Sequence, residues 1–173
     1  MLIKIIVAIS TNNGIGKDNK LPWKYKDDIL FFSRNTIGAG NNAVLMGKNT
    51  WLSIGKPLRN RMNIVVSTTL SEIEGINVSK SIEDAIALAE KSGISTLWVI
   101  GGSSIYEWFL NNEISDEVII SKIPEDYVCD TFFPEIDKTR WRETYRFAIG
   151  DRGLEVIYHK NRLKPHNDNY LIA

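Results

Sequence analysis

Two adjacent acids, Asp27 and Asp28, stand where a proline-containing loop runs into an apolar segment, within the stretch Leu21–Phe32. If that segment is a helix, Asp28 shares a face with Phe32, because positions i and i+4 lie one above the other. Burial on this face favours the neutral acid and raises the pKa of Asp28, unless a cationic edge of a ligand pairs with the carboxylate. Asp28 is therefore either a helix-start residue or an acid that binds a ligand in a pocket. Asp27 falls on a neighbouring face, where a first-turn acid facing the helix dipole is the more common role.

Small, hydroxylated and cationic residues follow several segments that have the composition of strands. They are Gly47-Lys48-Asn49-Thr50, Ser67-Thr68-Thr69 and Gly101-Gly102-Ser103-Ser104. Backbone N–H groups and positive helix-dipole ends at such places bind phosphates, and Lys48 adds a point charge. Because open α/β sheets bind ligands at the carboxyl ends of their strands, these segments predict a cradle for a dinucleotide. The glycines do not form a Gly-x-Gly-x-x-Gly fingerprint, so a Rossmann fold is not indicated.

The polar segment 10–20 follows the first of these strands and is too long for a tight turn. Loops of this length in compact domains are often functional lids, although a plain surface loop has the same composition. Its own residues do not decide between the two interpretations.

Alternating strand and helix patterns run through most of the chain. Strands are expected at 2–9, 42–47, 63–67, 76–79, 96–100, 117–123, 141–148 and 154–160, and helices at 26–35, 81–91 and 105–110, with a short helix after residue 47. This order predicts a single α/β domain with a twisted, mostly parallel eight-stranded sheet, helices on both faces and an antiparallel C-terminal edge strand. The domain is expected to cover residues 1–160. The tail, residues 161–173, is polar up to Tyr170-Leu171-Ile172, and the sequence leaves open whether that apolar end docks.

The composition is that of an ordinary globular domain: the 173 residues are 43% hydrophobic and 24% charged, enough to bury a core. Lys+Arg and Asp+Glu both number 21, and this zero net charge argues against a nucleic-acid partner bound through bulk charge. The single cysteine, Cys129, permits no disulfide within the chain and favours a reducing compartment, expected to be the cytoplasm. No segment approaches the ~18 apolar residues of a membrane span, so no membrane partner is expected.

Neither a metal site nor a catalytic histidine is expected. His159 and His166 are isolated, and no cluster of His, Cys and Asp has the spacing of metal ligands. The apolar residues 1–9 are few and include Lys4, so they are interpreted as a buried strand rather than a signal peptide. Without an evident interface pattern, a monomer is the expected state.

Five linked motifs, in order along residues 5–160, resemble those of the dihydrofolate reductases. They are Leu21-Pro22-Trp23 with Asp28, Phe32 and Thr36 at fixed spacings, Val44–Trp51, Ser53–Leu58 with Arg61-Met62-Asn63, Ile100-Gly101-Gly102 with Ile105-Tyr106, and Asp130-Thr131-x-Phe133-Pro134. The resemblance implies that fold, and an enzyme that reduces 7,8-dihydrofolate to 5,6,7,8-tetrahydrofolate with NADPH as cofactor. It also implies a role in one-carbon metabolism and binding of antifolate-type small molecules.

The resemblance assigns catalytic roles to Asp28, Leu21, Trp23 and Ser121. Asp28 matches the family's single pocket acid, which holds the pterin's amino and ring N–H groups and assists protonation of N5 through water, a form of general-acid catalysis. Leu21 and Trp23 match the lid over the nicotinamide. Ser121 stands where the family usually has threonine behind the acid, and its hydroxyl is expected to keep that hydrogen bond. The cofactor supplies the hydride and the protein supplies alignment.

The substrate-binding residues implied by the resemblance surround the folate's rings and its glutamate. They are Ile6, Val7, Ala8, Asp28, Ile29, Phe32, Ile54, Lys56, Arg61, Ile100, Tyr106 and Ser121. Arg61 matches the arginine that grips the α-carboxylate of the glutamate, a bidentate role that suits guanidinium. Lys56 adds charge nearby.

The cofactor-binding residues implied by the resemblance follow the nicotinamide and the phosphates. They are Ala8, Ile15, Gly16, Asn19, Lys20, Leu21, Gly47, Lys48, Asn49, Thr50, Ser67, Thr68, Lys80, Ile100, Gly101, Gly102, Ser103, Ser104, Ile105, Tyr106 and Thr131. A cis peptide usually joins the glycine pair, Gly101 and Gly102, in the family. Lys48 and Asn49 stand where two cations are frequent, which leaves the strength of the preference for NADPH over NADH open.

Two rival interpretations remain at this point. One is a pyrimidine reductase of riboflavin synthesis on the same fold, against which the Trp23-to-Asp28 spacing and Arg61 argue. The other is a nucleotide-binding protein without catalysis, against which Asp28, Ser121 and Tyr106 argue.

Overall fold

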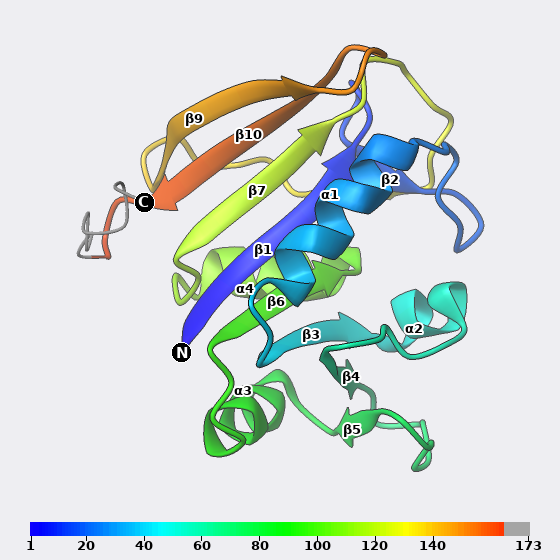
Figure 1. The fold of residues 1–173 in the computed structure, drawn as a ribbon, viewed down its shortest axis with the longest axis vertical. Coiled ribbons are helices and arrows are strands. Elements are labelled where there is room, and N and C mark those ends of the chain that lie inside the picture. The colour runs from blue at the N-terminus through cyan, green and yellow to red at the C-terminus, as the bar shows by residue number, and fades with distance from the viewer. Residues whose placement is uncertain (165–173) are drawn as a thin grey trace.

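The computed structural model describes residues 1–164, in which helices pack on both sides of an eight-stranded main sheet (Figure 1). The eight strands lie in the order β5-β4-β3-β6-β1-β7-β10-β9. Their bounds are β1 Leu2–Ile9, β3 Asn42–Gly47, β4 Met62–Val66, β5 Asn77–Ser79, β6 Thr96–Gly101, β7 Glu117–Lys122, β9 Trp141–Ile149 and β10 Leu154–Asn161. A separate two-stranded sheet pairs β2 Gly14–Gly16 with β8 Thr131–Phe132. The helices are α1 Lys26–Ile37, α2 Lys48–Ile54, α3 Ile82–Lys91 and α4 Ser103–Asn111.

Strand β1 lies at the centre of the parallel part of the sheet. It pairs in parallel with both β6 and β7, so that Ile5 is in register with Val99 on one side and Val118 on the other. Strand β10 runs antiparallel to β7, and β9 closes the sheet as its antiparallel neighbour. The predicted eight-stranded, mostly parallel sheet with an antiparallel C-terminal element is confirmed, with β9 as the outermost strand of that hairpin.

The two faces of β1 bury different side chains. Ile3, Ile5, Val7 and Ile9 pack in a core with α3 and α4, whereas Ile6 points to the core formed with α1 and α2. This division follows from the alternation of side chains along a strand. Because both faces are covered, the strand reads as a nearly continuous apolar run.

Helix ends follow local capping chemistry. The Ser81 side chain accepts a hydrogen bond from the Asp84 N–H at 3.0 Å and so caps α3, as its sequence predicts. Helix α1 runs two residues beyond the expected end at Asn35, because Thr36 is fully buried and continues the packed face. Gly38, with φ of 54°, then ends it.

The sequence predicts a loop over the whole of segment 10–20, and the structure differs from that prediction in one part. It contains β2, whose pairing with β8 links this loop to Thr131. Strands of three and two residues carry no periodic pattern, so the sequence offered no signal for them.

The packed part of the chain extends past the predicted boundary at residue 160. The Asn161 side chain is almost fully buried, and its amide donates hydrogen bonds to the carbonyls of Glu113 (3.1 Å) and Ser115 (3.0 Å). Lys164 forms an ion pair with Asp116 at 2.9 Å. The expected apolar end at 170–172 lies outside the described residues. No helix within residues 1–164 is long and apolar enough to cross a membrane.

Replacement of Asn161 by alanine is expected to lower the free energy of unfolding by about 2 kcal/mol or more, because the carbonyls of Glu113 and Ser115 lose buried donors. Asn112→Ala is the matched control, since the exposed Asn112 amide donates only to the carbonyl of Trp108 at 2.8 Å. Its effect should stay within about 0.5 kcal/mol. Urea unfolding followed by fluorescence measures both, and equal losses would contradict the structural role of Asn161.

Candidate active site

A cavity of about 940 Å³ runs along the carboxyl ends of β1, β3, β4 and β6, between α1 and α4. Its wall includes every residue predicted to bind the cofactor, and most of those predicted to bind the substrate. The predicted residues on the wall are Ile6, Val7, Ala8, Ile15, Gly16, Asn19, Lys20, Leu21, Asp28, Ile29, Phe32, Gly47, Lys48, Asn49, Thr50, Ile54, Ser67, Thr68, Lys80, Ile100, Gly101, Gly102, Ser103, Ser104, Ile105, Tyr106, Ser121 and Thr131. The sheet therefore gathers residues from segments far apart in the sequence into one site, as the rule for open α/β sheets predicts.

Asp28 lies in the first turn of α1, with its carboxyl in the cavity above the sheet. Burial raises the pKa of the Asp28 carboxyl, and a hydrogen bond with the Ser121 hydroxyl opposes that rise. Ser121 reaches this point because it stands on β7 in register with Ala8 of β1. The result is a carboxyl that holds a proton more readily than an exposed aspartate does, which suits general-acid chemistry.

Tyr106 closes the cavity floor beside this acid. Its hydroxyl donates to the Ile6 carbonyl at 3.1 Å, and burial together with the charge of Asp28 raises the pKa of the phenol. Tyr106 therefore remains a neutral hydrogen-bond donor. It packs edge-on against Phe133, at 5.1 Å between ring centroids, which fixes the orientation of the phenol.

The end of β6 brings backbone close to the cavity. A cis peptide joins Gly101 to Gly102, as the family resemblance implied. A Cβ added at Gly101 would lie 3.2 Å from the Tyr106 ring, and one at Gly47 would lie 3.3 Å from Ile105. Gly102 is also the N-cap of α4, so the first N–H groups of that helix face the cavity mouth, where they can bind a phosphate.

Cations and hydroxyls collect at the far end of the cavity. Lys48 Nζ donates to Thr69 Oγ1 at 2.7 Å, and Lys80 Nζ donates to the Leu70 carbonyl at 3.2 Å. The Ser67 hydroxyl accepts hydrogen bonds from the N–H groups of Thr69 (3.2 Å) and Leu70 (3.1 Å), which shapes the turn after β4. Two ammonium groups beside a hydroxyl-lined turn form an electrostatic site for a phosphate ester.

Arg61 and Lys56 do not line the cavity, although Leu58, which lies between them in the sequence, does. Arg61 is half-buried: Nη1 donates to Thr36 Oγ1 at 2.7 Å and Nε donates to the Arg59 carbonyl at 2.9 Å. Burial lowers the pKa of Arg61, which nevertheless stays charged at any ordinary pH. Lys56 is exposed on the loop after α2. Their predicted contacts with a glutamate therefore require a ligand that extends beyond the cavity.

Trp23 does not line the cavity, although the resemblance placed it in the lid. It is buried in a separate cluster with Tyr25, Ile123 and Leu154, and its ring lies 5.3 Å from that of Tyr127. The Trp23 Nε1–H has no hydrogen-bond partner among the described residues. Leu21, which is largely exposed, is the part of this loop that reaches the cavity wall.

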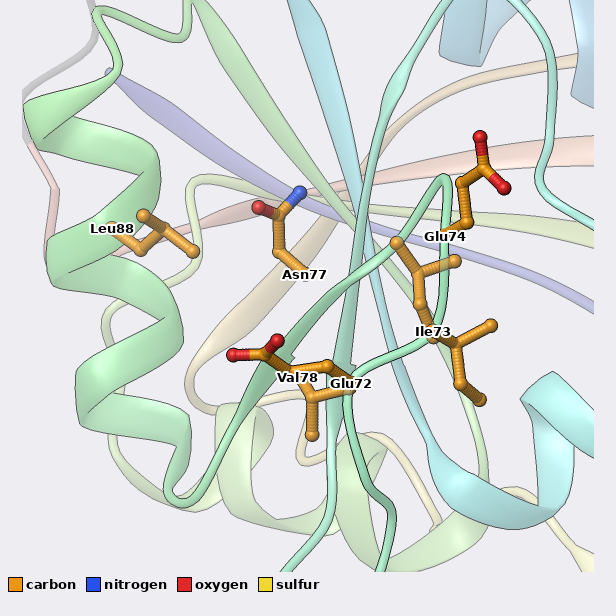
Figure 2. Close-up of a pocket in the computed structure, with 7 residues that line it drawn as sticks. Glu72, Ile73, Glu74, Asn77, Val78 and Leu88 are labelled. Atoms are coloured by element: carbon orange, nitrogen blue, oxygen red, sulfur yellow. The ribbon is translucent and has the colours of Figure 1, made fainter.

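Ser53, Leu58 and Val66 line the cavity without having been named as site residues, and so does Thr69, which the sequence had placed only in the segment Ser67-Thr68-Thr69 of the expected dinucleotide cradle. Each of the four lies within or next to a predicted residue or motif, so sequence proximity was the available signal. A second cavity, of about 460 Å³, lies between β5, α3 and the loop 70–76 (Figure 2). Leu88, Asn77 and two glutamates surround it, and none of the predicted site residues does.

The fold and the site define a class: a single-domain α/β enzyme that combines a dinucleotide cradle with a pocket acid of raised pKa. Residues 2–158 match the family described as dihydrofolate reductase. The chain belongs to the dihydrofolate reductase family. The resemblance drawn from the sequence motifs is thereby confirmed, and neither rival interpretation gains support.

Relatives from distant organisms show the same match. A dihydrofolate reductase of Gallus gallus is 40% identical over 146 residues, covering 76% of this chain and 77% of the relative. One from Bacillus subtilis is 37% identical over 142 residues, covering 82% and 80%. Among solved structures, a dihydrofolate reductase from Enterococcus faecalis complexed with NADP(H) and RAB-propyl has a TM-score of 0.83 and 28% identity, covering 93% of this chain and 96% of that one.

The raised pKa of Asp28 predicts a pH-dependent stability. The folded chain binds this proton more tightly than the unfolded chain, so the free energy of unfolding falls as pH rises from the ordinary aspartate pKa, about 3.9, through the folded pKa. Asp28→Asn removes the buried charge, and we expect it to raise stability at pH 7 but not below about pH 4. Urea unfolding at several pH values measures the difference. Asp27→Asn is the control, and an equal gain in that variant would refute burial of Asp28 as the cause.

Proposed function

We propose that this protein catalyses the NADPH-dependent reduction of 7,8-dihydrofolate to 5,6,7,8-tetrahydrofolate. The observation that carries the proposal is a single cavity, in a member of the dihydrofolate reductase family, that joins the Asp28 carboxyl to a phosphate-binding end. The neighbouring structure from Enterococcus faecalis, complexed with NADP(H), supports the choice of cofactor.

NADPH fits the residues present. A Cβ at Gly101 or Gly47 would make a tight contact with the Tyr106 or Ile105 side chain, so glycine at both positions suits a wall that holds a flat nicotinamide and a pyrophosphate. The start of α4 offers N–H groups to the pyrophosphate, and Lys48 with Lys80 offers charge to the adenosine 2′-phosphate. When bound, NADPH supplies the hydride.

Asp28 acts on the pterin. Its carboxyl accepts hydrogen bonds from the pterin's amino and ring N–H groups, and it assists the movement of a proton through water to N5. Protonation of N5 makes the adjacent carbon a better hydride acceptor. Ser121 orients the carboxyl, and the apolar walls contributed by Ile6, Phe32 and Ile100 keep bulk water out, which strengthens these polar interactions.

The remaining site residues bind the outer parts of the ligands. Arg61, already held by Thr36 and the Arg59 carbonyl, presents its guanidinium to the α-carboxylate of the substrate's glutamate, with Lys56 nearby. Leu21 covers the nicotinamide, and Trp23 supports that loop from behind.

The setting proposed for this activity is a cytoplasmic monomer that binds antifolate-type molecules and no nucleic acid. A single cysteine and a net charge of zero support it. Light scattering at micromolar concentration tests the oligomeric state.

Asp28→Asn is expected to fold and to lose about 10²-fold or more of its turnover at pH 7, because the general acid is gone. In acid, where the substrate is already protonated, part of the rate should return. NADPH consumption, followed by absorbance with and without dihydrofolate, measures the turnover. Asp27→Asn is the control, and near-normal turnover of Asp28→Asn at pH 7 would end the catalytic assignment.

Lys48→Ala is expected to raise the KM for NADPH about tenfold, because a charge-assisted hydrogen bond to the 2′-phosphate is lost. NADH lacks that phosphate, so its KM should change little. Steady-state kinetics with the two cofactors make the comparison within one variant. Equal losses with NADPH and NADH would contradict a 2′-phosphate contact for Lys48.

A further inference from the structure

Three segments far apart in the sequence converge on Tyr25, the residue that precedes α1. Tyr25 is only 3% exposed, and its hydroxyl donates to Glu125 Oε1 at 3.1 Å. The guanidinium carbon of Arg152, from the β9–β10 turn, lies 4.0 Å from the centroid of the Tyr25 ring. Arg152 Nη1 also donates to the Lys24 carbonyl at 3.4 Å. Tyr25 is therefore held at its hydroxyl, at its ring face and through the neighbouring backbone.

The same carboxylate also holds the support of the lid. Glu125 Oε2 accepts a hydrogen bond from the Tyr127 hydroxyl at 2.6 Å, and the Tyr127 ring packs against Trp23. The hydrogen bonds from Tyr127 and Tyr25 lower the pKa of Glu125, and the hydrogen bond to Glu125 is the main cause that raises the pKa of Tyr127 to about 12. Glu125 is thus an anion that receives two phenolic donors at neutral pH, a stronger arrangement than bonds between neutral groups.

The position of Tyr25 determines where Asp28 enters the cavity. Tyr25 is the N-cap of α1, and its carbonyl accepts the N–H of Ile29 at 3.2 Å, in the turn that carries Asp28. The Tyr25 side chain provides no cap to the helix itself, so the first turn depends on contacts from outside it. A small rotation of this turn would change both the burial of the Asp28 carboxyl and its distance from Ser121.

We propose that Glu125 is a positioning residue for the reductase reaction, acting through Tyr25 on the first turn of α1 and through Tyr127 on Trp23. Together with Arg152 these residues form a clamp, the Glu125–Tyr25–Tyr127–Arg152 clamp, outside the cavity wall. The proposal rests on the proposed function for its kinetic consequence. Glu125 itself is exposed, and exposed polar contacts contribute little to global stability. Its loss therefore acts locally, on the geometry of the acid.

Steady-state kinetics of Glu125→Ala test the proposal. We expect kcat for dihydrofolate to fall about tenfold, because misplacement of a catalytic group is costly, while the KM for NADPH stays within about twofold. Glu125→Gln should recover most of kcat, because an amide can still bond both hydroxyls. Glu155→Ala is the matched control, since Glu155 is a partly exposed carboxylate of β10 that bonds Arg146 and, among the described residues, forms no hydrogen bond with a member of the clamp. A normal kcat in Glu125→Ala, or equal changes in kcat and in the KM for NADPH, would overturn the proposal.

A second variant, at Tyr25, tests whether Tyr25 and Glu125 act through the same hydrogen bond. Tyr25→Phe keeps the ring and its stacking on Arg152 but loses the hydroxyl. Because the two groups act through one hydrogen bond, the double variant Tyr25→Phe/Glu125→Ala should have about the kcat of Glu125→Ala alone. Multiplied losses in the double variant would show that the two residues act separately and would overturn the clamp.

Hydrogen exchange provides a readout without turnover. The Ile29 N–H, which donates to the Tyr25 carbonyl, should exchange about tenfold faster in Glu125→Ala than in Glu155→Ala. If the unmodified protein does not oxidise NADPH when dihydrofolate is added, the proposed function fails while this exchange measurement still tests the clamp. Equal exchange in the two variants would refute the clamp whatever the enzyme's activity.

Discussion

The site depends on taking the Asp28 carboxyl out of bulk water without giving it a cation. No basic side chain within residues 1–164 forms an ion pair with it. Ser121 offers a hydrogen bond, which offsets part of the desolvation and no more, and the pKa of Asp28 stays raised. An acid kept in this state costs the fold stability at neutral pH. In the proposed function that cost is offset, because the N–H donors of the ligand supply hydrogen bonds to the carboxyl that the protein does not.

The strand pairings of the sheet place the other site residues around the buried Asp28 carboxyl. Parallel pairing of β1 with β7 sets Ala8 beside Ser121, and α1 crosses above them. Parallel pairing of β1 with β6 brings the Gly101–Gly102 backbone to the same edge of the sheet, so a dinucleotide can lie alongside the acid. The sheet itself thus sets the distance between the proton-bearing group and the hydride-bearing cofactor. Substitutions in the core strands would therefore affect the reaction by shifting the register of these strands, and not by removing a contact with the ligands.

The sequence predicted what depends on local patterns. The strand at 2–9, the hairpin expected at 141–148 and 154–160 and the Ser81 cap follow from periodicity and capping chemistry, and the structure contains them. Most residues of the cavity wall were implied by the family resemblance. The sequence could not predict the pairing of β2 with β8, because both strands are too short to show a period. It also did not predict that the Trp23 ring packs with Tyr25, Ile123 and Leu154, because motif spacing places a residue along the chain but does not say toward which side of a loop it turns. The position of Trp23 depends on Tyr127, which is remote in sequence.

The clamp around Tyr25 also depends on contacts between residues that are remote in sequence. Its central hydrogen bond joins residues a hundred positions apart, and no property of Tyr25 or Glu125 alone distinguishes them from ordinary surface residues. Only the fold brings a phenol, a carboxylate and a guanidinium together next to the helix that carries Asp28. The motifs shared with the family specify which acid is proposed to bind the ligand. Contacts outside those motifs determine how deeply the Asp28 carboxyl is buried. Homologues with the same motifs can therefore differ in how firmly they position this acid.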